Sequence, residues 1–404
     1  MKKINICFIS IFLIVIFGFS AAFAVVPDKD ISEEENRSLA KFPDFSLENL
    51  ISGNFTAEMN TYFADQFVAR NELVGIKSVA ELLLCKGENN GVLLGKNGQL
   101  AVKNFDVYKS VLDDSVNTDY YYKENIEVML SKYNEYADNV DLPLTTVLPP
   151  RTIDVAASAF NYPDTNSKNL SNLINNTISK NASYIDLVSE FQKRYNDGEY
   201  IYYKTDHHWT SLGAYYAYCS IMENWGMADS IISKEQFKIE KINSFYGTTW
   251  SKSGMKFINP DIMEIWSLGN EDEFETNCYY SKKVKNDKGE FVSEKVSYKN
   301  FDGWINREHL TTKNKYASFL DGTHNEQTVF KKTGEKRERL LIAKDSFADS
   351  LVPFLAQHFD LVVVNLSNNM VNLSDYIREY GCDRVLVVYN FENIISDSNI
   401  AKIK

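Results

Sequence analysis

The C-terminal end of the sequence alternates short apolar runs with helical segments. Apolar runs at residues 340–343, 361–364 and 385–389 are separated by helical patterns at 348–358 and 374–381. Short runs of apolar, largely β-branched residues are typical of strands that are buried on both faces of a parallel sheet. The alternation therefore predicts βαβ units, in which a helix returns the chain so that the next strand lies parallel to the last.

A second block of the same kind lies upstream. Apolar runs at 142–148 and 184–188 predict strands, and the patterns at 170–178 and 210–225 predict helices. Residues 226–337 differ, with many Tyr, Thr, Lys and Asn residues in short segments. This stretch is typical of short antiparallel strands. We therefore expect one parallel sheet that is assembled from two parts of the chain and interrupted by a β-rich insertion.

The region before these blocks is mainly helical in pattern. Apolar residues recur at helical spacing between 47 and 84, with a break around 65–70. Residues 92–100 predict a strand pair with an Asn-Gly turn, and 125–139 predict a helix. The expected organisation is thus a signal or anchor at 1–26, a helical leader at 27–139, the α/β domain at 140–225 and 338–404, and its insertion at 226–337.

The N-terminus is a membrane-targeting element. Lys2 and Lys3 precede a stretch, residues 4–26, in which the only polar side chains are one Asn and two Ser. Ala22-Phe23-Ala24 fits the small-x-small pattern of a signal peptide cleavage site, yet the run is also long enough to span a bilayer. Cleavage and retention as an anchor both remain open. In either case the paired lysines stay in the cytoplasm and the chain after Pro27 is exported to the cell surface or beyond it.

Charge and cysteine content exclude several classes of protein. The chain of 404 residues has 43 Lys and Arg against 55 Asp and Glu, a net charge of -12. Clustered basic residues supply most of the affinity for phosphate backbones, so nucleic acid is not an expected partner. The five cysteines form no CxxC motif and no cluster with histidine in the sequence, so we expect buried small apolar cysteines, no metal site and no cofactor.

Ser346 is the first candidate for chemistry. The strand at 340–343 continues into Lys344-Asp345-Ser346-Phe347 and then a helix, which places the Ser346 hydroxyl at the carboxyl end of a strand. Ligands of open α/β sheets bind at this edge, and helix N-termini favour developing negative charge. The alternative is that Ser346 or Asp345 is only the N-cap of the helix.

The second candidate is the stretch Asp206-His207-His208, which lies just before the helix at 210–225. Side chains two residues apart in an extended segment project to the same side, so Asp206 can orient His208 and stabilise its imidazolium. His207 would then point away, toward Trp209. A capped helix with surface histidines and an Asp/His metal site are the alternatives.

The order of these elements resembles that of SGNH-type esterases in circularly permuted form. In those enzymes the nucleophile comes first, an Asn assists the oxyanion, and an Asp/His pair precedes the last helix. Here Ser346 opens the C-terminal block, Asn390 follows the third strand of that block, and Asp206 and His208 lie upstream. The expected fold is therefore an SGNH-like, flavodoxin-like α/β parallel sheet that is circularly permuted.

Longer motifs resemble the DHHW family, which is similar to alginate O-acetylation proteins of the AlgX and AlgJ type. The signature is residues 205–210, Thr-Asp-His-His-Trp-Thr, with Gly213, and weaker likenesses lie at 35–39, 62–70 and 91–98. The resemblance implies an SGNH-like domain that transfers acetyl groups to extracellular polysaccharide or removes them. It also implies a membrane-bound O-acyltransferase as the source of acetyl.

By motif, the resemblance makes Ser346 the nucleophile, His208 the base and Asp206 its orienting group. For the oxyanion we expect the backbone N–H of Ser346 or Phe347 together with the Asn390 side chain. One departure is Lys344, which stands where SGNH enzymes have the Gly of Gly-Asp-Ser. A carbohydrate O-acetylesterase, or a non-catalytic polysaccharide-binding scaffold of an export complex, is therefore kept as an alternative to the O-acetyltransferase.

Three further residues have two interpretations each. Arg151 follows the strand at 142–148 and is either a contact for a substrate anion or an ion-paired arginine. Trp250 and Trp304 of the insertion either stack on sugar rings or pack in the core. The acidic net charge disfavours a strongly anionic polymer, so a neutral or weakly charged glycan is the expected substrate.

Overall fold

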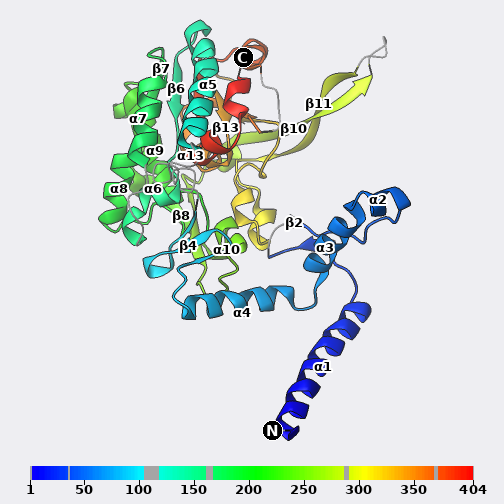
Figure 1. Ribbon diagram of the computed structural model, residues 1–404. Coiled ribbons are helices and arrows are strands. Elements are labelled where there is room, and N and C mark those ends of the chain that lie inside the picture. Colours follow the sequence, from blue (N-terminus) through cyan, green and yellow to red (C-terminus); the bar gives the residue numbers. More distant parts are fainter. Residues whose placement is uncertain are drawn as a thin grey trace. The chain divides into compact units, whose positions relative to one another are not determined.

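The structure is a computed structural model (Figure 1). It describes residues 2–34, 37–103, 118–160, 167–285, 291–367 and 372–403. Two residues of the leader motif at 35–39, Glu35 and Asn36, lie outside the described residues. The chain divides into two compact units. The smaller contains residues 1–90 and 250–258, and the larger contains residues 91–249 and 259–404.

The smaller unit is mainly helical. Its elements are α1 (Lys2–Val25), β1 (Ile31–Ser32), β2 (Arg37–Ser38), α2 (Leu47–Ile51), α3 (Asn54–Gln66), α4 (Arg70–Leu83) and β3 (Glu88–Asn89). The break between α3 and α4 falls within the predicted 65–70, where Ala69 has a φ of 57° that an α-helix does not allow. Within the described residues, α1 alone is long and apolar enough to cross a membrane, and it fits a signal sequence or an anchor.

The larger unit is built on an eight-stranded sheet with the strand order β11-β10-β12-β14-β13-β15-β6-β7. The strands β14, β13, β15, β6 and β7 are parallel to their neighbours, whereas β12, β10 and β11 extend the sheet in antiparallel fashion. The parallel strands are β6 (Leu144–Val147), β7 (Ala182–Ile185), β13 (Arg339–Lys344), β14 (Asp360–Asn365) and β15 (Arg384–Val388). Because β6 and β7 come from the upstream block and the other three from the C-terminal block, the predicted permuted α/β fold is confirmed.

Helices cover both faces of this sheet, which explains why its strands are apolar throughout. On β13, Leu340 and Ile342 belong to one hydrophobic core, and Leu341 and Ala343 belong to the other. Successive side chains of a strand point to opposite faces, so a strand between two helical layers needs apolar residues at every position. The covering helices are α5 (Thr118–Asn139), α6 (Thr152–Val155), α7 (Ser167–Thr177), α8 (Val188–Asn196), α9 (Ser211–Asn224), α11 (Val352–Leu355), α12 (Leu373–Tyr380) and α13 (Phe391–Ser396).

The first of the two helices predicted at 47–84 is divided into α2 and α3, and two predicted elements of the larger unit also differ locally from the structure. The predicted strand at 184–188 ends at Ile185, and Val188 begins α8, a helix that was not predicted from the sequence. The predicted helix at 348–358 begins as a 3-10 helix, η9 (Ser346–Leu351), and continues as α11. In both places the apolar residues are buried as expected, but periodicity over a few residues does not distinguish a strand end from the first turn of a helix.

The insertion contains antiparallel strands, of which two are not short. β8 (Lys238–Phe245) pairs with β9 (Asp261–Ser267), and β12 (Glu326–Lys331) joins the central sheet. β10 (Phe274–Lys285) and β11 (Phe291–Asp302) have 12 residues each. β12 pairs only with the stretch of β10 from Phe274 to Tyr279, so the rest of the β10–β11 hairpin extends past the sheet (Figure 1).

The remaining elements are small. β4 (Val92–Leu94) and β5 (Leu100–Val102) form the hairpin predicted at 92–100, and α10 (Thr248–Ser253) has its first two residues in the larger unit. The 3-10 helices are η1 (Lys96–Gly98), η3 (Ala157–Ala159), η4 (Ala228–Ser230), η5 (Lys234–Gln236), η6 (Glu271–Glu273), η7 (Arg307–Thr311), η8 (Lys315–Ser318) and η10 (Asn399–Lys402).

Candidate active site

The Asp-His-His-Trp motif lies on a tight loop just before α9. Tyr202 and Trp209 form a β-bridge, and the Thr210 N–H donates to the Ile201 carbonyl at 2.9 Å, which closes the loop at its base. Asp261 of β9 fixes the other end, where its carboxylate accepts hydrogen bonds from the backbone N–H and the hydroxyl of Thr205. The motif is therefore held by backbone pairing on one side and by a buried carboxylate on the other.

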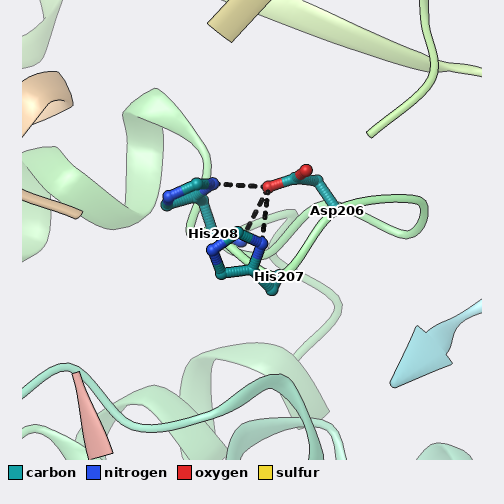
Figure 2. Close-up of side chains that lie close together, drawn as sticks. All are labelled: Asp206, His207 and His208. Atoms are coloured by element: carbon teal, nitrogen blue, oxygen red, sulfur yellow. Dashed lines mark hydrogen bonds and ion pairs between the residues drawn. The ribbon is translucent and has the colours of Figure 1, made fainter. Parts of the chain in front are cut away.

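Within this loop, Asp206 and His208 are hydrogen-bonded as the sequence spacing suggested. His208 Nδ1 lies 2.5 Å from Asp206 Oδ1, and the His208 backbone N–H donates to the same oxygen at 3.0 Å (Figure 2). The other oxygen of Asp206 accepts the Thr248 N–H at 2.7 Å and the Thr248 hydroxyl at 3.0 Å. Both carboxylate oxygens are thus occupied, which fixes the orientation of the His208 ring.

Ser346 lies on the far side of the His208 ring. Its Oγ is 2.7 Å from His208 Nε2, so Asp206, His208 and Ser346 form one continuous hydrogen-bonded chain. The N-cap of η9 is Asp345, whose Oδ1 accepts the Phe347 N–H at 3.0 Å. Because Asp345 takes the capping position, the Ser346 hydroxyl is available to the histidine.

The position of Ser346 follows from the topology of the sheet. β13 ends at Lys344, and its neighbours are β14 on one side and β15 on the other. The chain crosses from β13 to β14 and then returns to the opposite side of β13, which makes this strand end a topological switch point. Ligand sites of open α/β sheets form at such points.

Two aromatic side chains tie the Asp-His-His-Trp loop to the Ser346 turn. The Trp209 indole N–H donates to the Phe347 carbonyl at 3.1 Å and lies 2.8 Å from Ser350 Oγ. Tyr316 of η8 stacks on the His208 ring, with 4.0 Å between centroids and 10° between planes, and its hydroxyl donates to the Ser346 carbonyl at 3.1 Å. The insertion therefore supplies a residue that contacts both the histidine and the serine.

His207 does not pack on Trp209 as expected. Its ring lies 3.8 Å from that of His208 and 5.7 Å from that of Phe347, and its Nδ1 is 2.7 Å from Thr248 Oγ1. The tight loop turns both imidazoles toward the same side, and His207 is the more exposed of the two.

Burial and neighbouring charge set the protonation of the site. Burial and the neighbouring His207 together lower the pKa of His208 to about 4, although Asp206 opposes both effects. Burial alone would raise the pKa of Asp206, but the two histidines and the donated hydrogen bonds outweigh it and hold that pKa well below its usual range. At neutral pH the pair is thus a neutral imidazole beside an ionised carboxylate, the combination that a general base requires.

Lys344, which replaces the expected glycine, is fully buried and paired with Asp349 of η9. Burial raises the pKa of Asp349 to about 6, and the Lys344 ammonium opposes this shift. The ion pair of Lys344 with Asp349 therefore connects the end of β13 to η9, the helix that carries Ser346. SGNH enzymes have a glycine at the position of this lysine.

The predicted oxyanion donors differ in what they already bind. The Phe347 N–H donates to Asp345, so it is not directed at an approaching oxyanion. The Asn390 side chain caps α13 by accepting the Glu392 N–H, and its Nδ2 donates to the Pro149 carbonyl at 2.9 Å. The Asn390 backbone N–H bonds Asp345 at 2.6 Å, so this residue does lie at the carboxyl edge beside the serine turn.

Arg151 and Trp304 take the structural interpretations left open by the sequence. Arg151 is buried and forms a bidentate ion pair with Asp154 in the first turn of α6, with Nε–Oδ2 and Nη2–Oδ1 distances of 2.8 and 2.7 Å. Trp304 is buried and packs against Phe274 in the core. Trp250 belongs to the smaller unit.

Gly247, Thr248 and Tyr316 were not predicted from the sequence. A Cβ on Gly247 would lie 2.2 Å from the Cβ of Asp206, a separation that real structures do not allow. Gly247 is therefore the position at which the backbone of the insertion approaches the carboxylate, and the next residue supplies two of its hydrogen bonds. No local pattern marks these residues, because all three lie far along the chain from the motif they support.

The alternative of an Asp/His metal site also has a geometric basis. Ligand atoms of Asp206, His207 and His208 lie within 4.8 Å of one another. However, both ring nitrogens of His208 already have partners, Asp206 on one side and Ser346 on the other. The geometry of the described residues thus fits proton transfer from serine better than metal ligation.

Several solved structures are similar to this chain. They include a DHHW family protein from Eubacterium siraeum (22% identity, TM-score 0.54, covering 69% of this chain and 88% of that one) and Bacillus cereus PatB1 (20% identity, TM-score 0.53, covering 69% and 91%). The O-acetyltransferase domain of Pseudomonas putida AlgJ is a weaker match, with 11% identity and a TM-score of 0.42 over 76% of this chain and 93% of that one. Comparison with curated proteins gives no significant match. The family model described as DHHW protein matches residues 105–365, a segment that includes both the Asp-His-His-Trp loop and Ser346, and the chain belongs to the DHHW family.

Proposed function

We propose that this protein is an exported O-acetyltransferase that acts on a cell-surface or exported polysaccharide through a covalent acyl-enzyme. The observation that carries the proposal is the hydrogen-bonded chain from Asp206 through His208 to Ser346, with 2.5 and 2.7 Å between the bonded atoms. Side chains in this order activate a serine hydroxyl for attack on a carbonyl carbon. Membership of the DHHW family, which resembles polysaccharide O-acetylation proteins, supports acetyl as the group that is transferred.

In the first half-reaction, His208 Nε2 accepts the Ser346 proton as Oγ attacks the carbonyl carbon of the acetyl donor. The tetrahedral intermediate carries its negative charge on the former carbonyl oxygen. Collapse of the intermediate breaks the bond to the donor's alcohol, which takes the proton from His208 and leaves acetyl on Ser346. Asp206 remains ionised and stabilises the transient imidazolium.

For the oxyanion we assign the backbone N–H of Ser346 and the second amide hydrogen of Asn390. Among the described residues, the Ser346 N–H has no hydrogen-bond acceptor, whereas that of Phe347 has one in Asp345. Loss of one such donor typically slows turnover by about 10²–10³-fold. Arg151 has no part in the proposed chemistry, because Asp154 already binds its guanidinium.

In the second half-reaction, a sugar hydroxyl gives its proton to His208 and attacks the acetyl-serine, which yields the acetylated glycan. With water in place of the sugar, the same steps make the protein an acetylesterase. We propose that a membrane-bound O-acyltransferase supplies the acetyl group, and that α1 directs the chain to the outer side of the membrane, where the glycan is found.

The test is acetyl transfer by the purified protein from p-nitrophenyl acetate to neutral oligosaccharides. We expect release of p-nitrophenol, faster turnover when an acceptor is added, and an acetylated product detected by mass spectrometry. Ser346→Ala and His208→Ala should abolish both reactions. Release without any acceptor product would favour the esterase, and equal inertness of the wild type and both variants would favour the non-catalytic scaffold.

Covalent labelling gives a second measurement that needs no acceptor. One of the solved structures of PatB1 is that of the protein with a sulfonyl adduct. A sulfonyl fluoride should add a single sulfonyl group to this chain at Ser346, with loss of fluoride. Peptide mapping of the wild type against Ser346→Ala identifies the site, and Ser350→Ala, which alters the next serine of η9, is the matched control.

A further inference from the structure

A second cluster of metal-binding side chains lies within the insertion. Cys278 of β10, Asp321 and His324 place Sγ, a carboxylate oxygen and a ring nitrogen within 4.8 Å of one another. Cys278 is fully buried, and Asp321 and His324 are largely so. No local pattern in the sequence indicates this cluster, because Cys278 lies on a strand far upstream of the loop that carries the other two residues.

The carboxylate of Asp321 is the centre of the cluster. His324 Nε2 lies 2.9 Å from its Oδ2, and His309 Nε2 lies 2.9 Å from its Oδ1. Lys299 Nζ is 3.6 Å from Oδ1, and the Asn306 amide also donates to that oxygen. The two imidazoles therefore bind different oxygens of one carboxylate, and the Cys278 thiol lies close to the same carboxylate.

A polar group next to the cluster lacks a partner. Gln327 of β12 is fully buried, and its Nε2 lies 3.9 Å from Cys278 Sγ. Its Oε1 is buried without a hydrogen-bond partner among the described residues. Exchanging the two amide atoms would not help, because Nε2 already donates to the Leu320 and Gly322 carbonyls. Buried polar atoms of this kind commonly indicate a bound water or ion.

We propose that Cys278, Asp321 and His324 bind a zinc ion, with a water at the fourth position. Zinc takes a thiolate at about 2.3 Å and imidazole or carboxylate ligands at about 2.0–2.2 Å, so tetrahedral ligand atoms are separated by roughly 3.3–3.8 Å. The three ligand atoms lie within 4.8 Å of one another, so we infer that side-chain rotation brings them to that spacing.

The charges of the cluster also suit a dication. Binding releases the proton of the Cys278 thiol, and the thiolate together with the Asp321 carboxylate then neutralises Zn²⁺. The ammonium of Lys299 is already paired with Glu308 at 2.7 Å, besides its 3.6 Å approach to Asp321 Oδ1. Thiolate and imidazole ligands favour zinc over calcium or magnesium, which prefer sets of oxygen atoms.

Zinc at this position would link β10 to the segment of the insertion that precedes β12. Cys278 lies on β10, whereas Asp321 and His324 belong to the segment that runs through η7 and η8 into β12. Tyr316, which stacks on His208, lies in the middle of that segment. Metal binding at this cluster does not depend on whether the protein transfers acetyl groups.

The test uses Co²⁺ as a spectroscopic substitute for zinc in the reduced, metal-free protein without a histidine tag. We expect one equivalent of Co²⁺ to give a thiolate-to-cobalt charge-transfer band together with tetrahedral visible bands, all of which Zn²⁺ removes. Cys278→Ser should lose the charge-transfer band. Cys382→Ser, which alters the other buried cysteine of the larger unit, should keep it, and so should His207→Ala, which weakens the Asp206–His207–His208 group.

A second measurement covers the case in which Cys278→Ser does not fold. Zn²⁺ should raise the melting temperature of the wild type and of His207→Ala, but not that of His324→Gln. A folded wild type that shows neither a charge-transfer band nor a Zn²⁺-dependent rise would overturn the proposal. So would a charge-transfer band that survives in folded Cys278→Ser.

Discussion

At the scale of single residues, the proposed mechanism makes the activation of Ser346 depend on the protonation of His208. Burial, the neighbouring His207 and Asp206 together set the pKa of His208 at about 4, well below that of a free histidine. A protonated imidazole cannot accept the serine proton. Activity should therefore depend on pH in a way that reports this pKa.

We expect kcat/KM for p-nitrophenyl acetate to stay level as pH falls below about 6.5, the usual histidine pKa, and to decline only near pH 4. His207→Gln removes one cause of the low pKa, so its acid limb should move to higher pH. The measurement is the pH profile of kcat/KM for both proteins. Identical profiles with a midpoint near 6.5 would contradict a lowered pKa of His208.

Gly247 gives a second residue-scale prediction. Gly247→Ala would bring a methyl group to 2.2 Å from the Asp206 Cβ, so the carboxylate or the loop must shift. A displacement of about 1 Å can cost roughly 10²-fold in rate, and we expect at least that loss in kcat. Gly334→Ala, where a Cβ meets nothing within 4 Å, is the matched control and should keep full activity. Equal activity of the two variants would show that Gly247 has no positioning role.

At the scale of elements, the site depends on contacts between segments that are distant in sequence. β13 and η9 carry Ser346, the loop before α9 carries Asp206 and His208, and η8 carries Tyr316. The 3-10 helix η8 contributes both a stacked ring and a hydroxyl group. The two contributions can be separated by substitution.

Tyr316→Phe removes the hydroxyl bonds to Ser346 and Ser350 but keeps the ring on His208. A neutral hydrogen bond contributes about 0.5–1.5 kcal/mol, so kcat should fall only a few-fold. Tyr316→Ala also removes the ring and should lower kcat far more, with a loss of stability of about 3–5 kcal/mol. Kinetics and thermal unfolding of both variants check this, and comparable activity in the two would exclude a role for the stacking.

The buried pair between β13 and η9 gives another prediction. Lys344→Met leaves Asp349 buried without its partner, which should cost about 3–5 kcal/mol in the free energy of unfolding. Lys344→Met combined with Asp349→Leu removes both charges and should recover most of that loss. Urea denaturation of the three proteins measures the difference. A single variant as stable as the wild type would show that the pair does not hold this turn.

At the scale of the whole molecule, α1 fits a signal sequence or a membrane anchor, either of which would carry the rest of the chain out of the cytoplasm. Its segment Ile4–Val25 is long and apolar enough to cross a bilayer, and two lysines precede it. We expect a reporter enzyme that is active only outside the cytoplasm to be active when fused after Lys404. Replacement of Leu13 and Ile14 by Asp should abolish that activity. A reporter that is active only in the cytoplasm would contradict export.

The sequence predicted the fold better than it predicted the surroundings of the site. The strands around Leu340 and Val385 were recognisable because burial on both faces requires continuous apolar runs. Ser346 and His208 could be proposed because each lies in a local motif with a known chemistry. Gly247 and Tyr316 could not, since their roles arise only when the insertion folds back on the motif. The same is true of Cys278, whose neighbours in space are remote in sequence.

The place of β15 in the sheet has a consequence for biosynthesis. β15 lies between β13 and β6, and it is therefore the strand through which the C-terminal block meets the upstream block. A chain exported from its N-terminus delivers Asp206 and His208 early, Ser346 late and β15 later still. Nascent or prematurely terminated chains that stop before residue 384 would thus lack the strand that brings the serine to the histidine. If the chain is exported and acts through Ser346 as proposed, it would become active only after translocation is nearly complete, and truncated chains would have no activity.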